Sequence, residues 1–529
     1  MASPRRASVA PFGKYPLQEI LKRTAARVPE KVAVIDGEKS YTYRQLDEYS
    51  DRFAAALARL GVVKGDRVGI LTPNCIEFEI AFFGIIRAGA VATTINSGYR
   101  EREVAHQING AGAEVLIVHE ELLPVAEAAR DATPKLKRLI AVNATSADPD
   151  SFWGMMENAP PAPPSVAIDP DVDLAALPYS SGTTGLNKGV MLTHFNLTSN
   201  LDQLLGLEDD FAFTSADIIL VHLPLFHIYG LHVLMNPTIS VGGTQVMMGR
   251  FDMEEFLGLL SRHRVTRLFT VPPVGLGLTQ YPGVDKYDLS SLKTGVFGAA
   301  PLSADLQQRI EKTVGCPIIQ AYGMTETSPL ANTDFVDPDL RQYGSVGPAI
   351  PDTEEKVVDL ETGTNELARG EIGELMIRGP QVMKGYFENP EATKETLTDD
   401  GWIRTGDIVQ MNEEGYIWIL DRKKELIKYK GFQVPPAELE GLLLEHPAVA
   451  DAAVIGIPDV ESGEVPKAFV VKKPGEEPST AEIMDFVAGK VATFKRIKVV
   501  EFIDAIPKNP SGKILRRVLA EQERGKPGG

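Results

Sequence analysis

Cysteine is scarce in this chain, with only two among 529 residues. Cys75 and Cys316 stand far apart, each among apolar neighbours, so a disulfide framework is excluded and no cysteine metal site is indicated. Buried structural thiols are the expected state of both residues. Such usage is typical of proteins of the reducing cytosol, and we expect a cytoplasmic protein.

The chain also lacks a long uninterrupted apolar run. The stretch 218–249 has no Asp, Glu, Lys or Arg, but Pro224, Gly230 and Pro237 would break a membrane-spanning helix there. A buried strand, a loop, a helix and a second strand are predicted instead. The first fifteen residues have no apolar signal core, and the C-terminus is not a peroxisomal Ser-Lys-Leu address.

Basic residues are too few for a general nucleic-acid binder. There are 54 Lys and Arg against 72 Asp and Glu, a net charge of −18, whereas phosphate neutralisation needs clustered positive charge. The imbalance is uneven along the chain. From Lys423 onward about 17 basic residues face about 16 acidic ones, so the excess of acid lies almost wholly before that point.

The most informative segment present is Tyr179–Val190, YSSGTTGLNKGV, which follows the apolar run Leu174–Leu177. Its glycines, hydroxyls and lysine can surround a polyphosphate with N–H groups and an ammonium. A Walker A loop is excluded, because Asn187 and Gly189 stand where it needs Gly and Ser or Thr. Thr193 is predicted to cap the next helix. Taken alone, such a segment is more often a flexible linker.

Helical and strand patterns alternate over most of the chain, which predicts a parallel sheet built from βα units. Strands are expected at 218–223, 267–271, 294–297 and 318–322, each leading directly into a motif. Because ligands of open α/β sheets bind beyond the carboxyl ends of the strands, these motifs should converge on one pocket. The proline-rich linker Ala159–Pro164 separates a first α/β half from the half with the phosphate loop.

The pattern changes twice after the parallel strands. Short strands over about 355–420 predict a β-rich subdomain, and a compact α+β unit follows. Its helices are expected at 437–444 and 481–491, and its strands at 449–455, 468–471 and 499–502. The predicted fold class is α/β: a large N-terminal domain (residues 1–422) of two α/β subdomains and a β-rich subdomain, with a small α+β C-terminal domain (residues 423–529).

Seven segments resemble, in order, the motifs of the adenylate-forming superfamily of acyl-CoA synthetases, luciferases and peptide-synthetase adenylation domains. They are SSGTTGLNKG, LPLFHIYG, GAAP, QAYGMTET, TGD, DRKKELIKYKGFQVPPAELE and PKNPSGKILRR. The sequences KELIKYKGFQV and YGMTE are most similar to the corresponding motifs of 4-coumarate–CoA ligases. The resemblance implies ATP, Mg²⁺ and coenzyme A, a small carboxylic acid substrate, a mobile C-terminal domain and, as one assembly it allows, a homodimer.

The resemblance also implies roles at the nucleotide. Glu326 would hold Mg²⁺ and Thr325 would contact the α-phosphate, although alone this pair could simply begin a helix. Asp407 would accept both ribose hydroxyls, with Arg422 beside it. Tyr322 would stack on adenine above a Gly-Ala-Ala shelf. The implied nucleotide-binding set is Ser180, Ser181, Gly182, Thr183, Thr184, Gly185, Lys188, Gly298, Ala299, Ala300, Gln320, Tyr322, Asp407 and Arg422.

Lys513 resembles the lysine that neutralises charge between the substrate carboxylate and the ATP α-phosphate, a role suited to an ammonium. Alone, it would be a surface lysine in a glycine turn. Lys424 matches the hinge between the two domains. On the coenzyme A side, the matching residues are Lys428, Gly431, which would leave room for a pantetheine arm, and Gln433.

His227 alone would be a satisfied core histidine, but the resemblance implies that it gates the acyl channel. The implied substrate positions are Ile228, Tyr229, Val296, Phe297, Ala321, Gly323 and Pro329. Val296, Phe297 and Ala321 stand where plant 4-coumarate enzymes have lysine, serine and glycine, so the pocket should be more apolar or narrower. Asn187 replaces a common proline and would either contact phosphate or loosen the turn.

The implied activity is that of an ATP-dependent carboxylate–CoA ligase that forms an acyl-AMP intermediate and releases pyrophosphate and AMP. An aryl or a short- to medium-chain aliphatic acid is the expected substrate. A luciferase-like oxygenase and an enzyme that loads an acyl carrier protein remain open. A non-catalytic protein is disfavoured by the intact Lys188, Glu326, Asp407 and Lys513.

Overall fold

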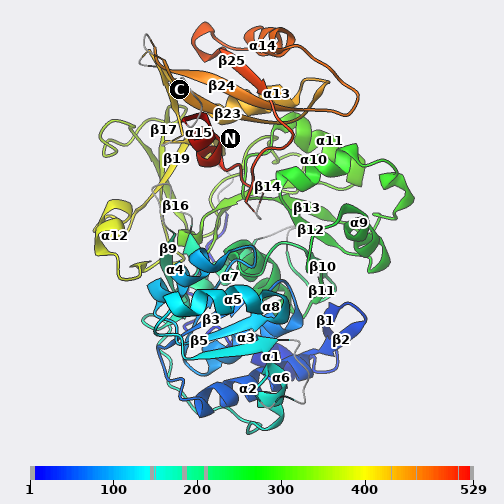
Figure 1. Cartoon of the computed structure of the whole chain (residues 1–529), viewed down its shortest axis with the longest axis vertical. Helices are drawn as coiled ribbons and strands as arrows, with labels where there is room; N and C mark the ends of the chain where they lie inside the picture. The colour runs from blue at the N-terminus through cyan, green and yellow to red at the C-terminus, as the bar shows by residue number, and fades with distance from the viewer. Residues whose placement is uncertain are drawn as a thin grey trace.

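Four β-sheets organise the chain in a computed structural model (Figure 1). It describes residues 6–142, 148, 150–180, 187–207, 212–423, 425–430, 432–459, 462–509 and 512–524, and the backbone alone at Phe432 and Gln433. Two eight-stranded sheets and one four-stranded sheet form the body, and a five-stranded sheet forms the C-terminal part. Within those ranges no helix is both long and apolar enough to cross a membrane.

The first sheet carries the phosphate-loop hairpin at one edge. Its order is β18 (Gly385–Tyr386), β9 (Lys188–Thr193), β7 (Leu174–Ala176), β4 (Val91–Thr94), β3 (Arg67–Leu71), β5 (Val115–His119) and β6 (Arg138–Val142), with β8 (Tyr179–Ser180) paired to β9. The helices of this region are α2 (Tyr43–Arg59), α3 (Ile76–Arg87), α4 (Glu101–Ala111), α5 (Leu123–Ala129) and α6 (Phe152–Glu157).

The second sheet contains the four strands that the sequence places before motifs. Its order is β15 (Leu330–Thr333), β14 (Ile318–Gly323), β13 (Thr294–Phe297), β12 (Arg267–Thr270), β10 (Ile218–Val221), β11 (Thr244–Met247), β1 (Val32–Asp36) and β2 (Lys39–Thr42). Its helices are α1 (Glu19–Arg27), α7 (His194–Leu205), α8 (Asn236–Val241), α9 (Met253–Arg262), α10 (Pro272–Gln280) and α11 (Ala304–Val314), with a π-helix at Gly230–Met235. The expected strand–helix–strand reading of 218–249 is confirmed.

Local signals explain the helix that follows the phosphate loop. Thr193 caps α7 as predicted: its hydroxyl accepts from the Asn196 N–H, and the Asn196 side chain accepts from the Thr193 N–H. Helix α3 is buried on every side, because it lies in the hydrophobic cluster shared by the two large sheets.

Cys75, just before α3, and Cys316 are both buried free thiols, as expected.

The β-rich subdomain and the C-terminal α+β unit are both present. The former is the antiparallel sheet β16 (Glu354–Val358), β17 (Ile372–Arg378), β19 (Ile403–Met411) and β20 (Ile417–Arg422), and the same stretch includes the short helix α12 (Pro390–Thr396). The C-terminal unit, at the top of Figure 1, has its own hydrophobic core. It comprises β21 (Ile427–Tyr429), β22 (Phe432–Val434), β23 (Val449–Asp459), β24 (Gly463–Lys472), β25 (Val499–Phe502), α13 (Pro436–Leu444), α14 (Thr480–Ala488) and α15 (Arg516–Arg524).

Candidate active site

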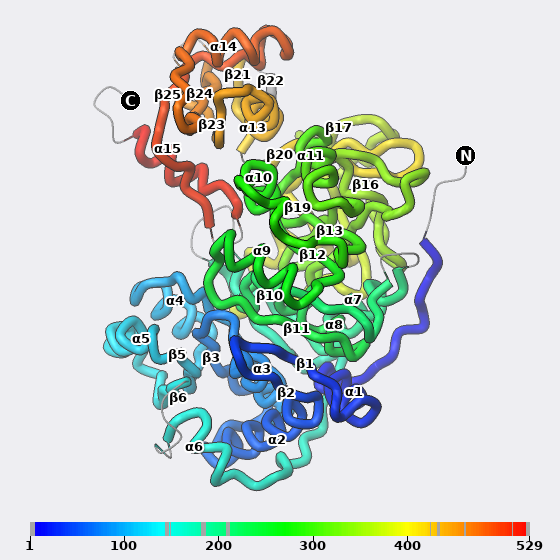
Figure 2. Tube along the Cα trace, turned by 90° about the vertical axis from the view of Figure 1, so that its right-hand side faces the viewer, coloured from blue at the N-terminus to red at the C-terminus, as the bar shows by residue number. Residues whose placement is uncertain are grey.

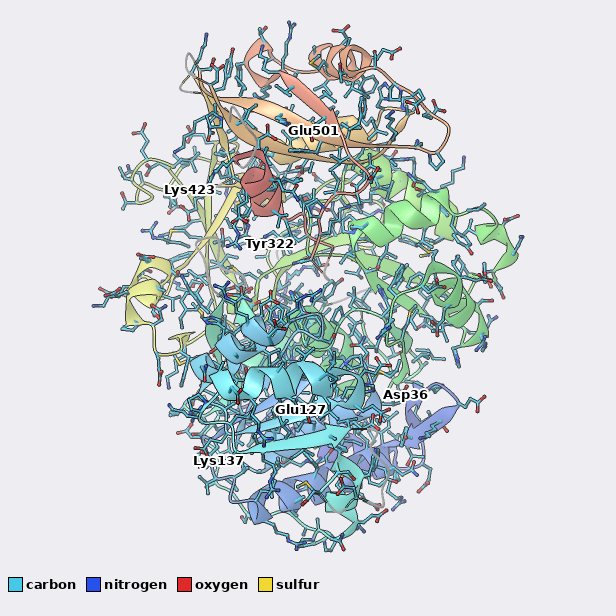
Figure 3. The ribbon with its side chains drawn as sticks, in the orientation of Figure 1. Asp36, Glu127, Lys137, Tyr322, Lys423 and Glu501 are labelled. Carbon is cyan, nitrogen blue, oxygen red and sulfur yellow. The ribbon has the colours of Figure 1, made fainter. Side chains whose placement is uncertain are left out.

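The motifs after β12, β13 and β14 lie at one edge of the second sheet, because these three strands are parallel neighbours. Tyr322, near the end of β14, lies between the lower sheets and the C-terminal unit in Figure 3. The sequence-based expectation that these motifs converge is therefore met by the topology.

The Gly-Ala-Ala loop after β13 holds a rare backbone conformation. Ala299 has φ +68°, a left-handed geometry that a non-glycine residue adopts only when its surroundings impose it. Gln320 helps to impose it: its side chain is buried, and Oε1 accepts from the Leu302 N–H at 2.9 Å. Gln320 was expected to bind the nucleotide. In this structure its side chain binds the loop on which the nucleotide was expected to lie.

Asp407, on β19, is held by one side chain from the neighbouring strand β20 and by one from β14 of the second sheet. Its Oδ2 accepts from the Tyr322 hydroxyl at 2.5 Å, and its Oδ1 lies 2.6 Å from Arg422 Nε. Arg422 faces it across the β19–β20 ladder. Burial and the Asp407 charge raise the pKa of Tyr322 well above its usual value, so that hydroxyl remains a donor. The three residues expected around adenosine thus form one charge-assisted network around the buried Asp407 carboxylate.

Glu326 accepts hydrogen bonds from two hydroxyl groups of the first sheet. Its Oε1 accepts from Ser180 and from Tyr386, both at 2.9 Å. The Tyr386 ring also lies under Lys188, whose Nζ is 5.1 Å from the ring centre. Tyr386 was missed by sequence reasoning, since a tyrosine after a glycine carries no signal of its own. Only the pairing of β18 with β9 brings it to this place.

The single carboxylate of Glu326 suits Mg²⁺ better than a metal that needs several protein ligands. In the described part of the chain, no group of three or more His, Cys, Asp or Glu could hold a metal ion. Magnesium keeps several waters and takes phosphate oxygens alongside one or two carboxylates. The donor set therefore fits a Mg²⁺ ion that arrives with a polyphosphate.

Asn187 anchors the exit of the phosphate loop to the first sheet's helices. Its side-chain amide donates to the Tyr99 hydroxyl. The backbone carbonyl oxygen of Asn187 lies 3.2 Å from His106 Nε2. The Asn187 side chain, which replaces a common proline, thus binds Tyr99 rather than facing phosphate. The loop residues Ser181, Gly182, Thr183, Thr184 and Gly185 lie outside the described residues, as do Lys424 and Gly431.

Lys513 reaches the same edge from the C-terminal unit. A Cβ on its neighbour Gly512 would lie 3.0 Å from Pro273 Cγ and 3.3 Å from Val271 Cγ2, so the turn rests against the end of β12. Burial, and next the Arg422 charge, lower the pKa of Lys513, while Glu425 and Asp407 oppose the shift. The Lys513 ammonium therefore lies within electrostatic range of Arg422 and Asp407.

His227 lies within the electrostatic reach of Lys513. Burial, and next the Lys513 charge, lower the pKa of His227 to about 4, so the imidazole is neutral at physiological pH. Its Nδ1 accepts from the Tyr229 N–H at 3.2 Å, which assigns the proton to Nε2. A neutral donor therefore stands near the lysine.

Tyr229, Val296 and Ala321 gather in one hydrophobic cluster, as expected of an acyl pocket. The Tyr229 hydroxyl donates toward the Val296 carbonyl at 3.2 Å, and a Cβ on Gly298 would lie 3.2 Å from the tyrosine ring. Gly323 has no room for a side chain, because a Cβ would lie 1.9 Å from the Pro329 carbonyl oxygen.

Two expected pocket residues lie elsewhere. Phe297 belongs to the cluster under α10 and α11, on the opposite face of β13 from Val296, because side chains alternate along a strand. Its side chain therefore does not join Tyr229, Val296 and Ala321 in their cluster. Ile228 is buried in the cluster between the two large sheets rather than in that of Tyr229.

The coenzyme A-side residues lie apart from Lys513 in this arrangement. Lys428 is exposed on β21, and its N–H donates to Glu464 Oε2 at 2.8 Å. The β21–β22 hairpin, which includes Gln433, lies above α13, whereas the segment before α15 reaches down to the body (Figure 2). The two groups of residues thus occupy different sides of the C-terminal unit.

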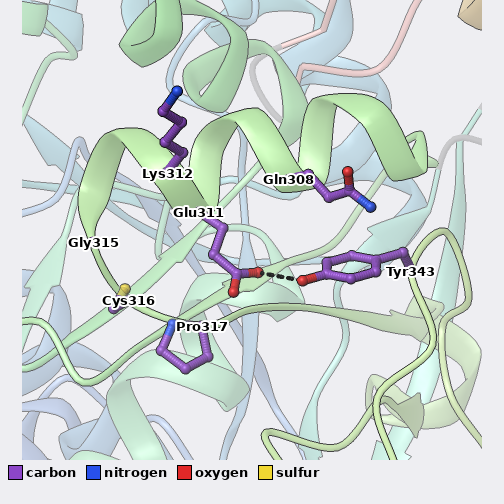
Figure 4. Close-up of a pocket in the computed structure, with 7 residues that line it drawn as sticks. All are labelled: Gln308, Glu311, Lys312, Gly315, Cys316, Pro317 and Tyr343. Carbon is purple, nitrogen blue, oxygen red and sulfur yellow. Dashed lines mark hydrogen bonds between the residues drawn. The ribbon is translucent and has the colours of Figure 1, made fainter. Parts of the chain in front are cut away.

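An open surface pocket of about 560 Å³ lies at the opposite edge of the second sheet (Figure 4). Its wall includes Glu311, whose Oε2 accepts from the Tyr343 hydroxyl at 3.2 Å, and Pro317, just before β14. The pocket therefore adjoins the start of β14, away from the motifs at its end.

The residues at the strand ends define a nucleotide site of the adenylate-forming type. The chain belongs to the AMP-binding enzyme family: residues 21–387 match the model of the AMP-binding enzyme, and residues 438–513 match that of its C-terminal domain. This confirms the family recognised from the motifs. It also confirms the class of enzyme, an AMP-forming acid–thiol ligase that uses ATP, Mg²⁺ and coenzyme A.

Within that family, the chain is similar to 4-coumarate–CoA ligases. It is 42% identical to 4-coumarate–CoA ligase 3 of Oryza sativa subsp. japonica, over 95% of this chain and 91% of the relative. It is 41% identical to the enzyme of Pinus taeda, over 95% and 94%.

Solved structures confirm the arrangement of a large N-terminal and a small C-terminal domain. An anthranilate CoA ligase in complex with anthranoyl-AMP superposes with a TM-score of 0.89 at 30% identity, covering 98% of this chain and 99% of that one. ATP-bound MatB from Rhodopseudomonas palustris gives a TM-score of 0.86 at 32% identity, covering 97% and 99%.

Proposed function

We propose that this protein joins a small carboxylic acid to coenzyme A in two half-reactions with an acyl-AMP intermediate. The observation that carries the proposal is the approach of Lys513, from the C-terminal unit, to the Asp407–Arg422–Tyr322 network and to His227. Charge of that sign is needed where a carboxylate meets a triphosphate. We also propose that residues 1–422 form the N-terminal domain and residues 423–529 the C-terminal domain. The cytoplasm is the proposed location of the enzyme.

In the first half-reaction, a carboxylate oxygen bonds to the α-phosphorus of ATP, and the bond to pyrophosphate breaks. Lys513 would neutralise the two approaching anions, with Thr325 at the α-phosphate and Asp407 at the ribose. A Mg²⁺ ion held by Glu326 would supply further positive charge to the phosphates. His227 is neutral, so it adds no charge of its own and can border the acyl group.

In the second half-reaction, the coenzyme A thiolate bonds to the acyl carbon, and the bond to AMP breaks. For this step the C-terminal domain would turn about Lys424, withdraw Lys513 and present Lys428, Gly431 and Gln433. The separation of the β21–β22 hairpin from the segment before α15 supports such an exchange (Figure 2).

We propose an aryl acid as substrate, with a short- to medium-chain aliphatic acid as the alternative. The relatives named above act on 4-coumarate and anthranilate. Val296 and Ala321, beside Tyr229, leave the pocket wall apolar, so a para-hydroxyl would be left without a partner.

The decisive experiment measures AMP and pyrophosphate release from ATP against a panel of aryl, branched and straight-chain acids, with and without coenzyme A. Formation of AMP that requires both the acid and coenzyme A is expected. Pyrophosphate release without a thioester would favour carrier loading, or oxidation of the adenylate if oxygen is consumed. No acid-dependent release across the panel would contradict the proposal.

The apolar wall has its own test. The substitution Val296→Lys should raise kcat/KM for 4-coumarate relative to cinnamate by about tenfold, because the lysine can pair with the hydroxyl. The matched change Phe297→Ser, on the other face of β13, should leave that ratio unchanged. An equal change in both variants would contradict the pocket assignment.

A further inference from the structure

Strand β19 bulges at the residue that the proposed function assigns to the ribose. Along the ladder between β17 and β19, Arg404 pairs with Met376, and the next pair is Ile408 with Glu374. Three residues of β19 therefore face one residue of β17, and we call these three the Asp407 bulge: Thr405, Gly406 and Asp407. A β-bulge interrupts the hydrogen bonds of the ladder and re-aims a side chain, so its backbone needs other partners.

The carboxylate of Glu374 on β17 is one of these partners. The residue is only 4% exposed. Its Oε1 accepts from the Gly406 N–H at 3.2 Å, and its Oε2 pairs with Lys423 Nζ at 2.9 Å. A buried carboxylate must find donors for both oxygens, because it has lost its water. Glu374 is thus satisfied only while the bulge and Lys423 stay in place.

The backbone of Lys423 holds the other side of the same glycine. Its N–H donates to the Gly406 carbonyl at 2.8 Å, while its Nζ pairs with Glu374. Lys423 lies beside β17 and β19 (Figure 3) and follows Arg422, which pairs with Asp407. Both the N–H and the carbonyl of Gly406 are therefore bound by groups outside the bulge, directly before Asp407.

Contacts within the bulge fix the backbone of Asp407 itself. The Thr405 hydroxyl donates to the Leu375 carbonyl at 2.8 Å and accepts from the Asp407 N–H at 3.0 Å. Gly406 has φ +71°, so the chain turns at this residue. The direction of the Asp407 side chain consequently depends on how firmly Gly406 is held.

We propose that Glu374 is a positioning residue of the nucleotide site, which fixes Gly406 and thereby aims the Asp407 carboxylate at both ribose hydroxyls. A carboxylate accepts from two hydroxyls at once only in a narrow range of directions. The inference rests on the proposed function, in which Asp407 binds the ribose. Loss of Glu374 should therefore weaken recognition of the ribose and leave the contacts to adenine and phosphate as they are.

The test compares AMP with 2′-deoxy-AMP, which lacks one of the two hydroxyls. Each nucleotide is titrated calorimetrically into the full chain, without acid or coenzyme A. The variants are Glu374→Ala and Glu374→Gln, whose amide oxygen can still accept from the Gly406 N–H. Glu354→Ala is the matched control, because this glutamate pairs with Arg378 across β16 and β17 of the same sheet.

The wild type should bind AMP about tenfold more tightly than 2′-deoxy-AMP, since the carboxylate is a charged acceptor. Glu374→Ala should lower this ratio to about twofold by weakening AMP alone, and Glu374→Gln should keep about half of it. The control should keep all of it. Equal weakening of both nucleotides would overturn the inference, because it would indicate a change of fold. An unchanged ratio in Glu374→Ala would overturn it as well.

A double-mutant cycle shows whether Glu374 acts through Asp407. In the background of Asp407→Asn, the further change Glu374→Ala should alter AMP affinity by less than about twofold. Losses that simply add would contradict the inference, because Glu374 would then act independently of Asp407.

The titrations also separate this inference from the proposed function. A wild type that binds AMP and 2′-deoxy-AMP equally would refute the ribose role of Asp407, and the role of Glu374 with it. A wild type that distinguishes them, with no change in Glu374→Ala, would refute the role of Glu374 alone. A ratio that falls in Glu374→Ala supports the inference even if no acid is activated.

Discussion

The body and the C-terminal unit hold their site residues in different ways. In the body, Asp407 and Glu326 each accept hydrogen bonds from two strands or loops, so their positions are set before any ligand arrives. Lys513 stands in a short turn closed by Asn509, and the turn meets the body through Gly512. Groups proposed to hold AMP in both half-reactions are thus built in, while the group proposed for one half-reaction is delivered on a separate unit.

The strongest test of this contrast is Lys513→Ala. Pyrophosphate exchange should fall about 10²–10³-fold, because the transition-state charge loses its partner, while thioester formation from supplied acyl-AMP changes little. Both rates are measured in single-turnover assays. Lys508→Ala, on the same segment but paired with Asp451, is the control and should affect neither step strongly. Equal losses in the two steps would refute the assignment of Lys513 to the first half-reaction alone.

The body side of the contrast is tested by Asp407→Asn. This change weakens the ion pair with Arg422 and the acceptor for Tyr322, so kcat/KM for ATP should fall about 10–100-fold. Thioester formation from acyl-AMP should fall as well, since the same ribose site is used. Calorimetric binding of AMP gives the loss directly. A defect confined to the first half-reaction would contradict the shared role.

A smaller effect is expected at Tyr386, which sequence reasoning missed. Tyr386→Phe removes one of two hydroxyls that hold Glu326 and should raise the Mg²⁺ concentration for half-maximal exchange about three- to tenfold. Tyr343→Phe, far from the site, serves as the control. If the magnesium dependence does not move, the hydroxyl does not position the carboxylate.

The smallest effect concerns the preassembly of the body itself. Glu79 on α3 is fully buried beside Gln245 of β11, and burial raises its pKa from 4.5 to about 8. Between these values the folded protein keeps a proton that the unfolded chain releases, so the free energy of unfolding falls as pH rises from about 5 to 8. Glu79→Gln should flatten this dependence in thermal melts. Parallel curves for both proteins would contradict it.

The elements that position the site were largely predictable. Strands β13 and β25 begin and end at the predicted residues, because each is a short, largely apolar run. The N-cap of α7 at Thr193 was equally predictable, because a capping box depends on two residues three positions apart. Such signals are local, and local interactions decide them.

Side-chain assignments were less predictable. Motif alignment assigned both Val296 and Phe297 to the pocket, yet neighbours in a strand point to opposite faces. Nor could the motif show that Oε1 of Gln320 accepts a hydrogen bond from the Leu302 N–H. A motif names the residues near a site without stating which way each side chain points.

By itself, the sequence determined the family, the order of the domains and the groups present at the nucleotide, because residue types and their spacing carry that information. Only the tertiary structure decided that Tyr386 joins Glu326, that Asn187 binds Tyr99, and that Lys513 approaches His227. These contacts join segments far apart along the chain. They depend on how sheets and domains pack, which no local pattern of residues specifies.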